Sequence, residues 1–328
     1  MTMADRTLTR EWMRGLRAWV DGTTGRGPHQ PLDMAARVRL DILGLGLGQT
    51  LGHLHHHRPD YDSFEAWVAE IAGPPDPDAI ARYHAWLDGA PPPEATQHRF
   101  DAIAAMPDVL SPADIRHWDE HGYVILRQAV SADEAAAMAS IVYETVGARP
   151  DDPASWYAGE NTIMIERFQG PGLDAARKSP RVHKAFAQLW GTPDLWTIID
   201  RLGFNPPVAH VAPGLGIRRH WDVSLVPPIP FATQAILYLT DTAPDQGALE
   251  LAPGFHRRID AWLAEHPDDP RAVDLSGETI FVGGNAGDLV IWHQALPHGA
   301  SPNCNRVPRL VQYVNMYSAD MVHAEEWR

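Results

Sequence analysis

Two segments decide the fold and the chemistry expected of this chain: residues 218–222, RRHWD, and residues 289–301, LVIWHQALPHGAS. On a β-strand, side chains two residues apart point to the same face. His220 and Asp222 are therefore expected to reach one metal ion together, and His298 from a distant strand can supply a third ligand. Two imidazoles and one carboxylate leave coordination positions open, which suits a non-haem Fe(II) ion that must also bind a cosubstrate and oxygen.

The length and composition are those of a globular protein. With 328 residues, the chain can form one large domain with elaborations or two modest domains, and it can bury a substantial core. Hydrophobic residues make up 45% of the sequence and charged residues 21%. No apolar run approaches the length needed to span a bilayer. We therefore expect a soluble protein.

The charge balance is acidic. Forty-two Asp and Glu residues against 27 Lys and Arg residues give a net charge of −15, and Lys178 and Lys184 are the only lysines in the sequence. Nucleic acids and anionic membranes both require a positive binding surface, so neither is expected as a partner. A small anionic substrate remains compatible, because a few arginines in a pocket are enough to bind it.

Cysteine content and the first residues indicate where the protein works. The single cysteine, Cys304, permits no internal disulfide and fits a reducing compartment. Residues 1–12 alternate charged and apolar side chains and lack the apolar core of a signal peptide. The expected location is the cytoplasm.

The first part of the chain has the periodicity of short helices. The expected helical segments are 8–19, 31–53, 62–71 and 76–87. Glycines weaken the second segment as a helix, and residues 62–65, DSFE, form an acidic capping box for the third. Residues 89–93, GAPPP, cannot continue a helix. We expect a helical N-terminal extension over residues 1–95, followed by a second domain over residues 96–328.

The second domain begins with helices and continues with strands. The expected helices are 111–121, 131–146, 180–190 and 193–202, and the expected strands are 123–126, 161–168, 208–212, 216–225, 232–241, 247–252, 279–282, 288–293 and 309–318. Short strands separated by Pro- and Gly-rich turns are typical of a sandwich or barrel. An antiparallel double sheet with helices packed outside is the simplest arrangement.

An ordered set of motifs extends this interpretation. The motifs are LSPAD (110–114), HGYVIL (121–126), HWD (220–222), GAL (247–249), PGFH (253–256), GD (287–288) and PHG (297–299). In this order, from about residue 110 to residue 317, the chain resembles the phytanoyl-CoA dioxygenase-like family of Fe(II)- and 2-oxoglutarate-dependent oxygenases. The resemblance implies a double-stranded β-helix, or jelly roll, flanked by helices. The N-terminal extension lies outside the resemblance.

The resemblance also assigns roles to individual residues. His220, Asp222 and His298 match the iron ligands of the family. Arg309, eleven residues after His298, matches the arginine that pairs with the distal carboxylate of 2-oxoglutarate, with Arg306 as the neighbouring alternative.

Further contacts to the cosubstrate are less clearly assigned. Many members of the family carry Ser or Thr two residues after the distal histidine, where this chain has Ala300. Anchoring of 2-oxoglutarate is therefore expected from Ser301, Tyr238 or Thr240.

Two other histidines compete for the ligand roles. His293 lies five residues before His298 and is the main alternative third ligand, but His298 has the Pro-His-Gly setting that the family uses. His256 follows a turn and is expected to be structural. Asp222 favours hydroxylation, because halogenating relatives replace this carboxylate with a small residue.

The residues expected to contact substrate are Arg218, Trp156, Arg167 and Tyr313. Arg218 precedes the His-x-Asp motif on the same face of the strand and is expected to meet an acidic group, although an outward-facing arginine would fit the pattern too. Tyr313 shares a face with Arg309 on the last strand, and the other two lie in a segment that often forms a lid.

The expected reaction is hydroxylation of a small metabolite or natural-product intermediate, with 2-oxoglutarate and O2 as cosubstrates and succinate and CO2 as co-products. The acidic charge makes a bulky CoA thioester a less attractive substrate. Two alternatives stay open: an iron-dependent isomerase or epimerase of the same fold, and a non-catalytic binding module. A homodimer formed through the N-terminal helices is compatible with the sequence.

Overall fold

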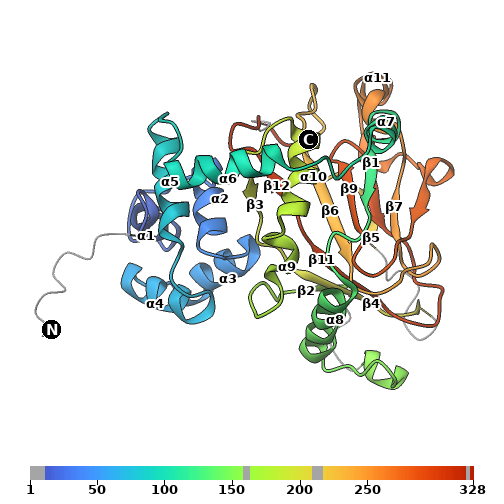
Figure 1. Ribbon diagram of the computed structural model, residues 1–328, viewed down its shortest axis with the longest axis horizontal. Helices are drawn as coiled ribbons and strands as arrows, with labels where there is room; N and C mark the ends of the chain where they lie inside the picture. The colour runs from blue at the N-terminus through green and yellow to red at the C-terminus, as the bar shows by residue number, and fades with distance from the viewer. Residues whose placement is uncertain (1–11, 158–162, 209–216, 323–325) are drawn as a thin grey trace, which may run out of the picture. The chain divides into compact units, whose positions relative to one another are not determined.

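The structure is a computed structural model that describes residues 12–157, 163–208, 217–322 and 326–328 (Figure 1). The chain divides into two compact units, Met1–Ala102 and Ile103–Arg328. The boundary expected from the sequence, at residue 95, falls at the start of helix α6 (Glu94–Ala105) instead of between elements. Among the described residues, no helix is long and apolar enough to cross a membrane.

The first unit consists of helices, as the sequence predicts. They are α1 (Leu16–Thr23), α2 (Met34–Ile42), α3 (Leu47–His57), α4 (Tyr61–Ile71), α5 (Pro77–Leu87) and most of α6. The single helix expected over 31–53 is wrong, because Gly44 adopts a φ of 71° and separates α2 from α3. The N-cap of α4 is Asp60, which precedes the capping box expected at residues 62–65. The side chain of Asp60 accepts a hydrogen bond from Ser63 N at 2.8 Å.

The second unit contains the jelly roll. A six-stranded antiparallel sheet has the order β1-β9-β6-β11-β4-β2, a four-stranded sheet has the order β5-β10-β7-β8, and β12 pairs with β3. The strands are β1 (Tyr123–Leu126), β2 (Met164–Ile165), β3 (Trp196–Thr197), β4 (Leu202–Asn205), β5 (Ile217–His220), β6 (Thr233–Tyr238), β7 (Leu249–Leu251), β8 (Ile280–Val282), β9 (Leu289–His293), β10 (His298–Ala300), β11 (Arg309–Tyr313) and β12 (Met316–Tyr317). The expected fold class is confirmed.

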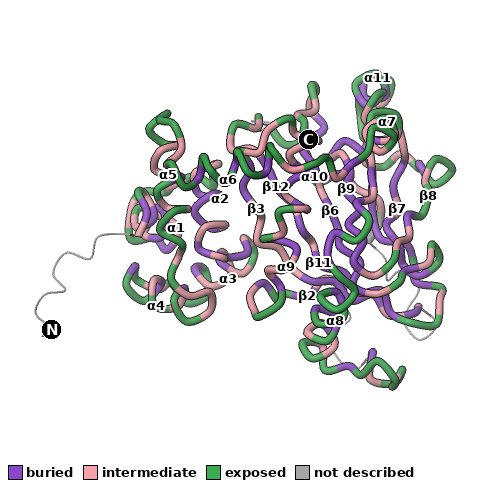
Figure 2. Tube along the Cα trace, viewed as in Figure 1, coloured by how far each residue is buried: buried purple, intermediate pink, exposed green. Residues whose placement is uncertain are grey.

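Alternation along the strands produces two hydrophobic cores. On β6, Ala235 and Leu237 belong to an outer core between the six-stranded sheet and helices α8 (Ala132–Val146) and α10 (Pro180–Trp190). Ile236 and Tyr238 belong to an inner core, which they share with Leu251 of the four-stranded sheet. Strands β6, β9 and β11 are accordingly buried along most of their length (Figure 2).

Two helices of this unit begin at the caps expected from the sequence. Helix α7 (Pro112–His121) starts after Ser111 and α8 starts after Ser131, each with a capping box. Helices α9 (Asp174–Arg177) and α11 (Ile259–Glu265) complete the set. Figure 1 shows α8 and α10 beside the six-stranded sheet.

Two elements differ from expectation because of pairing between distant segments. The helix expected over 193–202 is wrong: this stretch contains β3 and the start of β4, which pair with β12 and β11. Of the strand expected over 161–168, residues 163–168 are described, and within them only Met164–Ile165 form a strand, the short β2. The strand expected over 208–212 lies outside the described residues except for its first position.

Candidate metal centre

The three expected metal ligands come together at one end of the four-stranded sheet. His220 ends β5, and His298 begins β10 directly opposite it in the antiparallel register. His220 Nε2 lies 3.3 Å from Asp222 Oδ1, and His298 Nε2 lies 3.3 Å from Asp222 Oδ2. One ligand atom of each residue lies within 4.8 Å of those of the other two, and no other cluster of this kind occurs among the described residues.

Asp222 reaches this position from a bend and not from the strand expected over 216–225. Strand β5 stops at His220, and the backbone on both sides of Asp222 is held in place. The indole of Trp221 is buried in the inner core and donates a hydrogen bond to Ala295 O at 3.0 Å. Arg271 donates hydrogen bonds to Trp221 O at 2.9 Å and to Val223 O at 2.8 Å.

The electrostatics of the cluster favour an ionised carboxylate. Burial alone would raise the pKa of Asp222, but hydrogen bonds from His220 and His298 and the charge of these imidazoles hold it well below its usual range. His298 Nδ1 lies 3.0 Å from Leu296 O. When Nδ1 carries the proton and donates to this carbonyl, the lone pair of Nε2 is available to a metal.

The donor set fits a divalent iron ion. Two imidazole nitrogens and one carboxylate oxygen are the donor set used by many non-haem Fe(II) enzymes, and His220, Asp222 and His298 would hold such an ion. The side chain of Asp222 is 53% exposed and that of His298 is 6% exposed. The cluster is therefore open to solvent on the side of Asp222.

Arg309 is the expected anchor for 2-oxoglutarate, and its guanidinium is left without sufficient partners. The residue is 2% exposed and faces the inner core, with the same parity on β11 as Val311. Its Nε and Nη2 atoms are buried without a hydrogen-bond partner among the described residues, and it forms no ion pair there. Tyr313 offers the guanidinium a side-chain hydrogen bond, but a buried guanidinium without a carboxylate partner is costly unless a ligand supplies one. Arg306, the alternative, is exposed.

The buried polar atoms without a hydrogen-bond partner in the same unit include three on residues that bear on this site. Ser301 Oγ, Thr240 Oγ1 and Asn205 Oδ1 are buried without hydrogen-bond partners among the described residues. Asn205 lies opposite Arg309 in the β4–β11 register, and its Nδ2 donates to Ser301 O at 3.4 Å. Unsatisfied buried groups beside an unpaired arginine fit a site for a polar anionic ligand. The residues therefore fit 2-oxoglutarate as well as iron.

Two tyrosines, Tyr238 and Tyr313, lie near Arg309. The hydroxyl of Tyr238 donates to Val282 O at 2.6 Å and accepts from Leu249 N at 3.1 Å, so its proton is already engaged. Burial raises the pKa of Tyr238 to about 12. Burial also raises the pKa of Tyr313, an effect that the adjacent Arg309 guanidinium opposes.

The competing histidines lie outside the cluster. His293 contacts His256, with ring centroids 5.3 Å apart, and its Nδ1 accepts a hydrogen bond from Ala295 N at 3.0 Å. Burial lowers the pKa of His293 to about 4. His256 Nε2 lies 3.3 Å from Asp119 O. Both contacts are structural.

Of the residues expected to contact substrate, the described contacts bring only Tyr313 near Arg309. Trp156 belongs to the outer core, and its Nε1 donates to Arg149 O at 2.7 Å. Arg167 is exposed beside Gly170. The side chain of Arg218 lies outside the described part of the structure.

The sequence did not point to Gln234, Asn205 or Arg271. Gln234 donates a hydrogen bond to Asp222 Oδ2 at 2.6 Å. Its position on the expected strand 232–241, two residues before Ile236, indicates the inner face, and that parity was the available signal. Arg271 and Asn205 act through backbone groups or distant strands, for which the sequence carries no signal.

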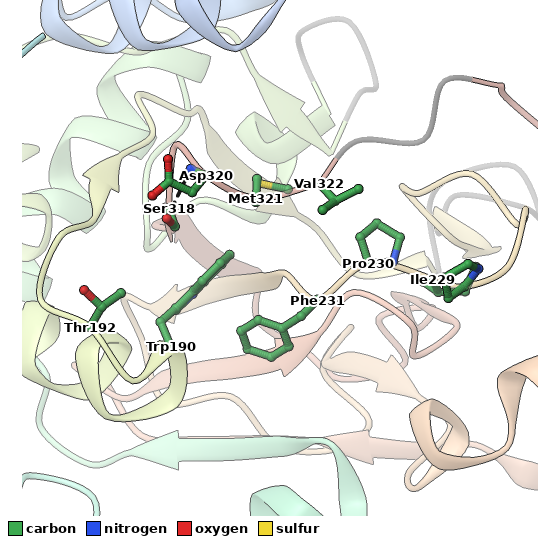
Figure 3. Close-up of a pocket in the computed structure, with 10 residues that line it drawn as sticks. Trp190, Thr192, Ile229, Pro230, Phe231, Ser318, Asp320, Met321 and Val322 are labelled. Carbon is green, nitrogen blue, oxygen red and sulfur yellow. Dashed lines mark hydrogen bonds between the residues drawn. The ribbon is translucent and has the colours of Figure 1, made fainter. Parts of the chain in front are cut away.

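A pocket of about 400 Å³ is lined by none of the three residues of the cluster (Figure 3). Its wall combines the end of α10 with the turn before β6 and the segment after β12, and the residues are Trp190, Thr192, Pro228, Ile229, Pro230, Phe231, Ser318, Asp320, Met321 and Val322. None of the expected site residues lines this pocket.

Comparisons with known proteins found similar chains. The chain is 25% identical over 232 residues to ectoine dioxygenase from Bordetella bronchiseptica, which covers 62% of this chain and 73% of that protein. Similar solved structures include EctD from S. alaskensis (TM-score 0.47, 19% identity, 67% of this chain and 85% of that one) and the non-heme alpha ketoglutarate dependent epimerase SnoN from nogalamycin biosynthesis (TM-score 0.45, 18% identity, 64% and 83%).

The family model described as phytanoyl-CoA dioxygenase (PhyH) matches residues 118–311, more than half of the chain. This range contains the His220, Asp222 and His298 cluster and also Arg309. The chain therefore belongs to the phytanoyl-CoA dioxygenase family of Fe(II)- and 2-oxoglutarate-dependent enzymes, which use oxygen as a further cosubstrate.

Proposed function

We propose that this protein is a dioxygenase that hydroxylates a small metabolite or natural-product intermediate and releases succinate and CO2. The observation that carries the proposal is the combination of a complete two-histidine, one-carboxylate cluster with a buried, unpaired arginine on a neighbouring sheet. The retained carboxylate of Asp222 supports hydroxylation, since a small residue at this position would leave room for halide.

His220, Asp222 and His298 are proposed to hold Fe(II), which would couple oxidative decarboxylation of 2-oxoglutarate to oxidation of the substrate. Asp222 contributes a negative charge, because its pKa lies well below its usual range. His298 presents Nε2 while Leu296 O fixes its Nδ1. The imidazoles must be unprotonated at Nε2 to bind the ion, so metal binding releases protons at acidic pH.

Arg309 is proposed to pair with the distal carboxylate of 2-oxoglutarate, with Ser301 and Thr240 as further donors. Each has an unsatisfied buried polar atom that a carboxylate could accept from. Tyr238 contributes less directly, because its only proton is donated to Val282 O. The ring of Tyr238 packs in the inner core near Arg309. Exclusion of water there would strengthen an ion pair between Arg309 and the cosubstrate.

A small substrate is favoured over a CoA thioester. The relative from Bordetella bronchiseptica is named for its action on ectoine, a small molecule. The net charge of −15 also opposes the approach of a highly anionic thioester. Tyr313, which lies beside Arg309, is the proposed substrate contact that the described geometry supports best.

A screen for substrate-stimulated succinate release tests the proposal. The Fe(II)-loaded protein would be incubated with 2-oxoglutarate, oxygen and a library of small metabolites, and succinate and product mass would be measured. We expect stimulated succinate release together with a product 16 mass units heavier, and no release from His220→Ala. Succinate release with an unchanged product mass would contradict hydroxylation, and no metal-dependent release with any compound would contradict enzymatic function.

A further inference from the structure

The carboxylate of Asp222 poses a question of orientation, because a carboxylate can bind a metal through one oxygen or through both. Binding through one oxygen keeps more coordination positions open for the cosubstrate and oxygen. Asp222 is half exposed, so packing alone does not fix the rotation of its side chain. Some neighbouring group has to hold one of its oxygens.

Gln234 is that neighbour. Its Nε2 donates to Asp222 Oδ2 at 2.6 Å, which is the shortest polar contact described for this carboxylate. Asp222 Oδ2 also lies 3.3 Å from His298 Nε2, whereas the described contact of Asp222 Oδ1 is with His220 Nε2 at 3.3 Å. The amide donor therefore engages one oxygen and leaves the other facing the first imidazole.

Trp292 determines which way the amide of Gln234 points. The indole Nε1 donates to Gln234 Oε1 at 3.1 Å. An indole N–H can only donate a hydrogen bond. The amide of Gln234 must therefore point Oε1 toward the indole, which leaves Nε2 pointing toward Asp222. The carbonyl oxygen of Gln234, which could itself bind a metal, is thereby turned away from the carboxylate.

Gln234 and Trp292 lie on paired strands of the six-stranded sheet. Gln234 and Trp292 are direct partners in the antiparallel register of β6 and β9, and Trp292 is 3% exposed in the inner core. The ring of Trp292 also lies against that of His298, with centroids 5.1 Å apart. One buried side chain thus contacts one ligand directly and orients another through an amide.

We propose that Gln234, held by Trp292, is a positioning residue that fixes the carboxylate of Asp222 so that a single oxygen is directed to the metal. This inference rests on the proposed role of His220, Asp222 and His298 as a metal site. A neutral amide suits the task because it stabilises the anion without adding a charge, and it extends the ligand set by an outer partner of the kind that commonly tunes metal affinity.

Binding of Co(II), a spectroscopic probe for this kind of site, tests the inference. Gln234→Met keeps the length of the side chain but removes the amide donor, and Trp292→Phe keeps the ring but removes the N–H. We expect Gln234→Met to weaken Co(II) binding by about 10- to 100-fold and to change the visible absorption bands of the bound ion. Trp292→Phe should change the same bands in the same direction by a smaller amount.

Gln312→Met is the matched control. Gln312 is a fully buried glutamine whose Nε2 donates to Leu173 O at 2.7 Å on the opposite face of the six-stranded sheet. It should keep the Co(II) affinity and spectrum of the parent even where its melting temperature falls. A purely structural role for Gln234 predicts the reverse: a lower melting temperature of the metal-free protein with an unchanged spectrum.

Gln234→Glu gives an independent test if Gln234→Met does not fold. A second carboxylate next to Asp222 should weaken Co(II) binding or add a ligand, and either result changes the spectrum. Wild-type affinity and spectrum in either folded Gln234 variant would overturn the inference while leaving the metal site intact. Co(II) binding that survives loss of His220 and His298 would overturn the metal site itself, and the inference with it.

Discussion

Arg309→Met should raise the stability of the metal-free protein and abolish tight binding of 2-oxoglutarate. The guanidinium is 2% exposed, two of its nitrogens have no hydrogen-bond partner and it forms no ion pair within the described chain. A buried charge without a partner is destabilising, and a hydrophobic side chain of similar length removes that cost. In the complex, the same guanidinium is expected to pair with a carboxylate.

The expected magnitudes are opposite in sign. Replacing buried charged groups by apolar ones stabilises proteins by up to about 1–4 kcal/mol, and each kcal/mol raises the melting temperature of a domain of this size by roughly 2–4 °C. Removing one partner of a buried, hydrogen-bonded charge pair costs about 2–5 kcal/mol of binding free energy. The dissociation constant for 2-oxoglutarate should therefore rise roughly 30-fold to several-thousand-fold.

Thermal unfolding of the metal-free protein and calorimetric titration of the metal-loaded protein with 2-oxoglutarate measure the two effects. Arg306→Met is the control, because Arg306 is exposed and lies three residues earlier in the chain. It should change neither quantity appreciably. If Arg309→Met lowers the melting temperature and leaves 2-oxoglutarate binding unchanged, Arg309 is a structural residue and the proposed cosubstrate site is wrong.

Two further predictions concern stability. Burial lowers the pKa of His293 to about 4, so the unfolded chain takes up its proton first as the pH falls below 6.5, and about 2 kcal/mol of stability should be lost between pH 7 and pH 5. His293→Asn should reduce this loss, which urea titrations at the two pH values measure. An equal loss of unfolding free energy in variant and parent would contradict the prediction. Gly247→Ala should destabilise the protein and weaken 2-oxoglutarate binding, because φ is 66° and the new Cβ would clash with the side-chain amide of Asn205, which lies opposite Arg309. Gly147→Ala, with φ of 67° and no atom within 4 Å, should show the strain alone, and equal 2-oxoglutarate affinities in the two variants would refute the effect on the site.

The metal cluster could be predicted from the sequence because its residues lie in local motifs. The spacing of His220 and Asp222 and the Pro-His-Gly setting of His298 carry the information within a few residues. In the structure the three residues do come together, but Asp222 does not lie on the strand as expected. Strand β5 ends at His220, and Arg271 holds the backbone on both sides of Asp222. That anchor lies 50 residues away in the chain, and nothing near the motif announces it.

The errors come from contacts between distant segments. Residues 193–202 have the composition of a short helix, but their backbone groups are used by β12 and β11, more than a hundred residues later. Gln234 was missed for a similar reason: its partners are Asp222 in a bend and Trp292 on another strand. A side chain whose role is to orient another one cannot be recognised before the two are brought together.

Anaerobic titration with Fe(II), followed by addition of 2-oxoglutarate, tests the central claim most directly. A chelated 2-oxoglutarate on Fe(II) gives a visible charge-transfer band, which reports both ligands at once. We predict that the protein binds one Fe(II) ion and develops this band, and that a variant with both His220→Ala and His298→Ala binds no Fe(II) and develops no band. Wild-type Fe(II) binding and an unchanged band in that variant would contradict the proposed metal site.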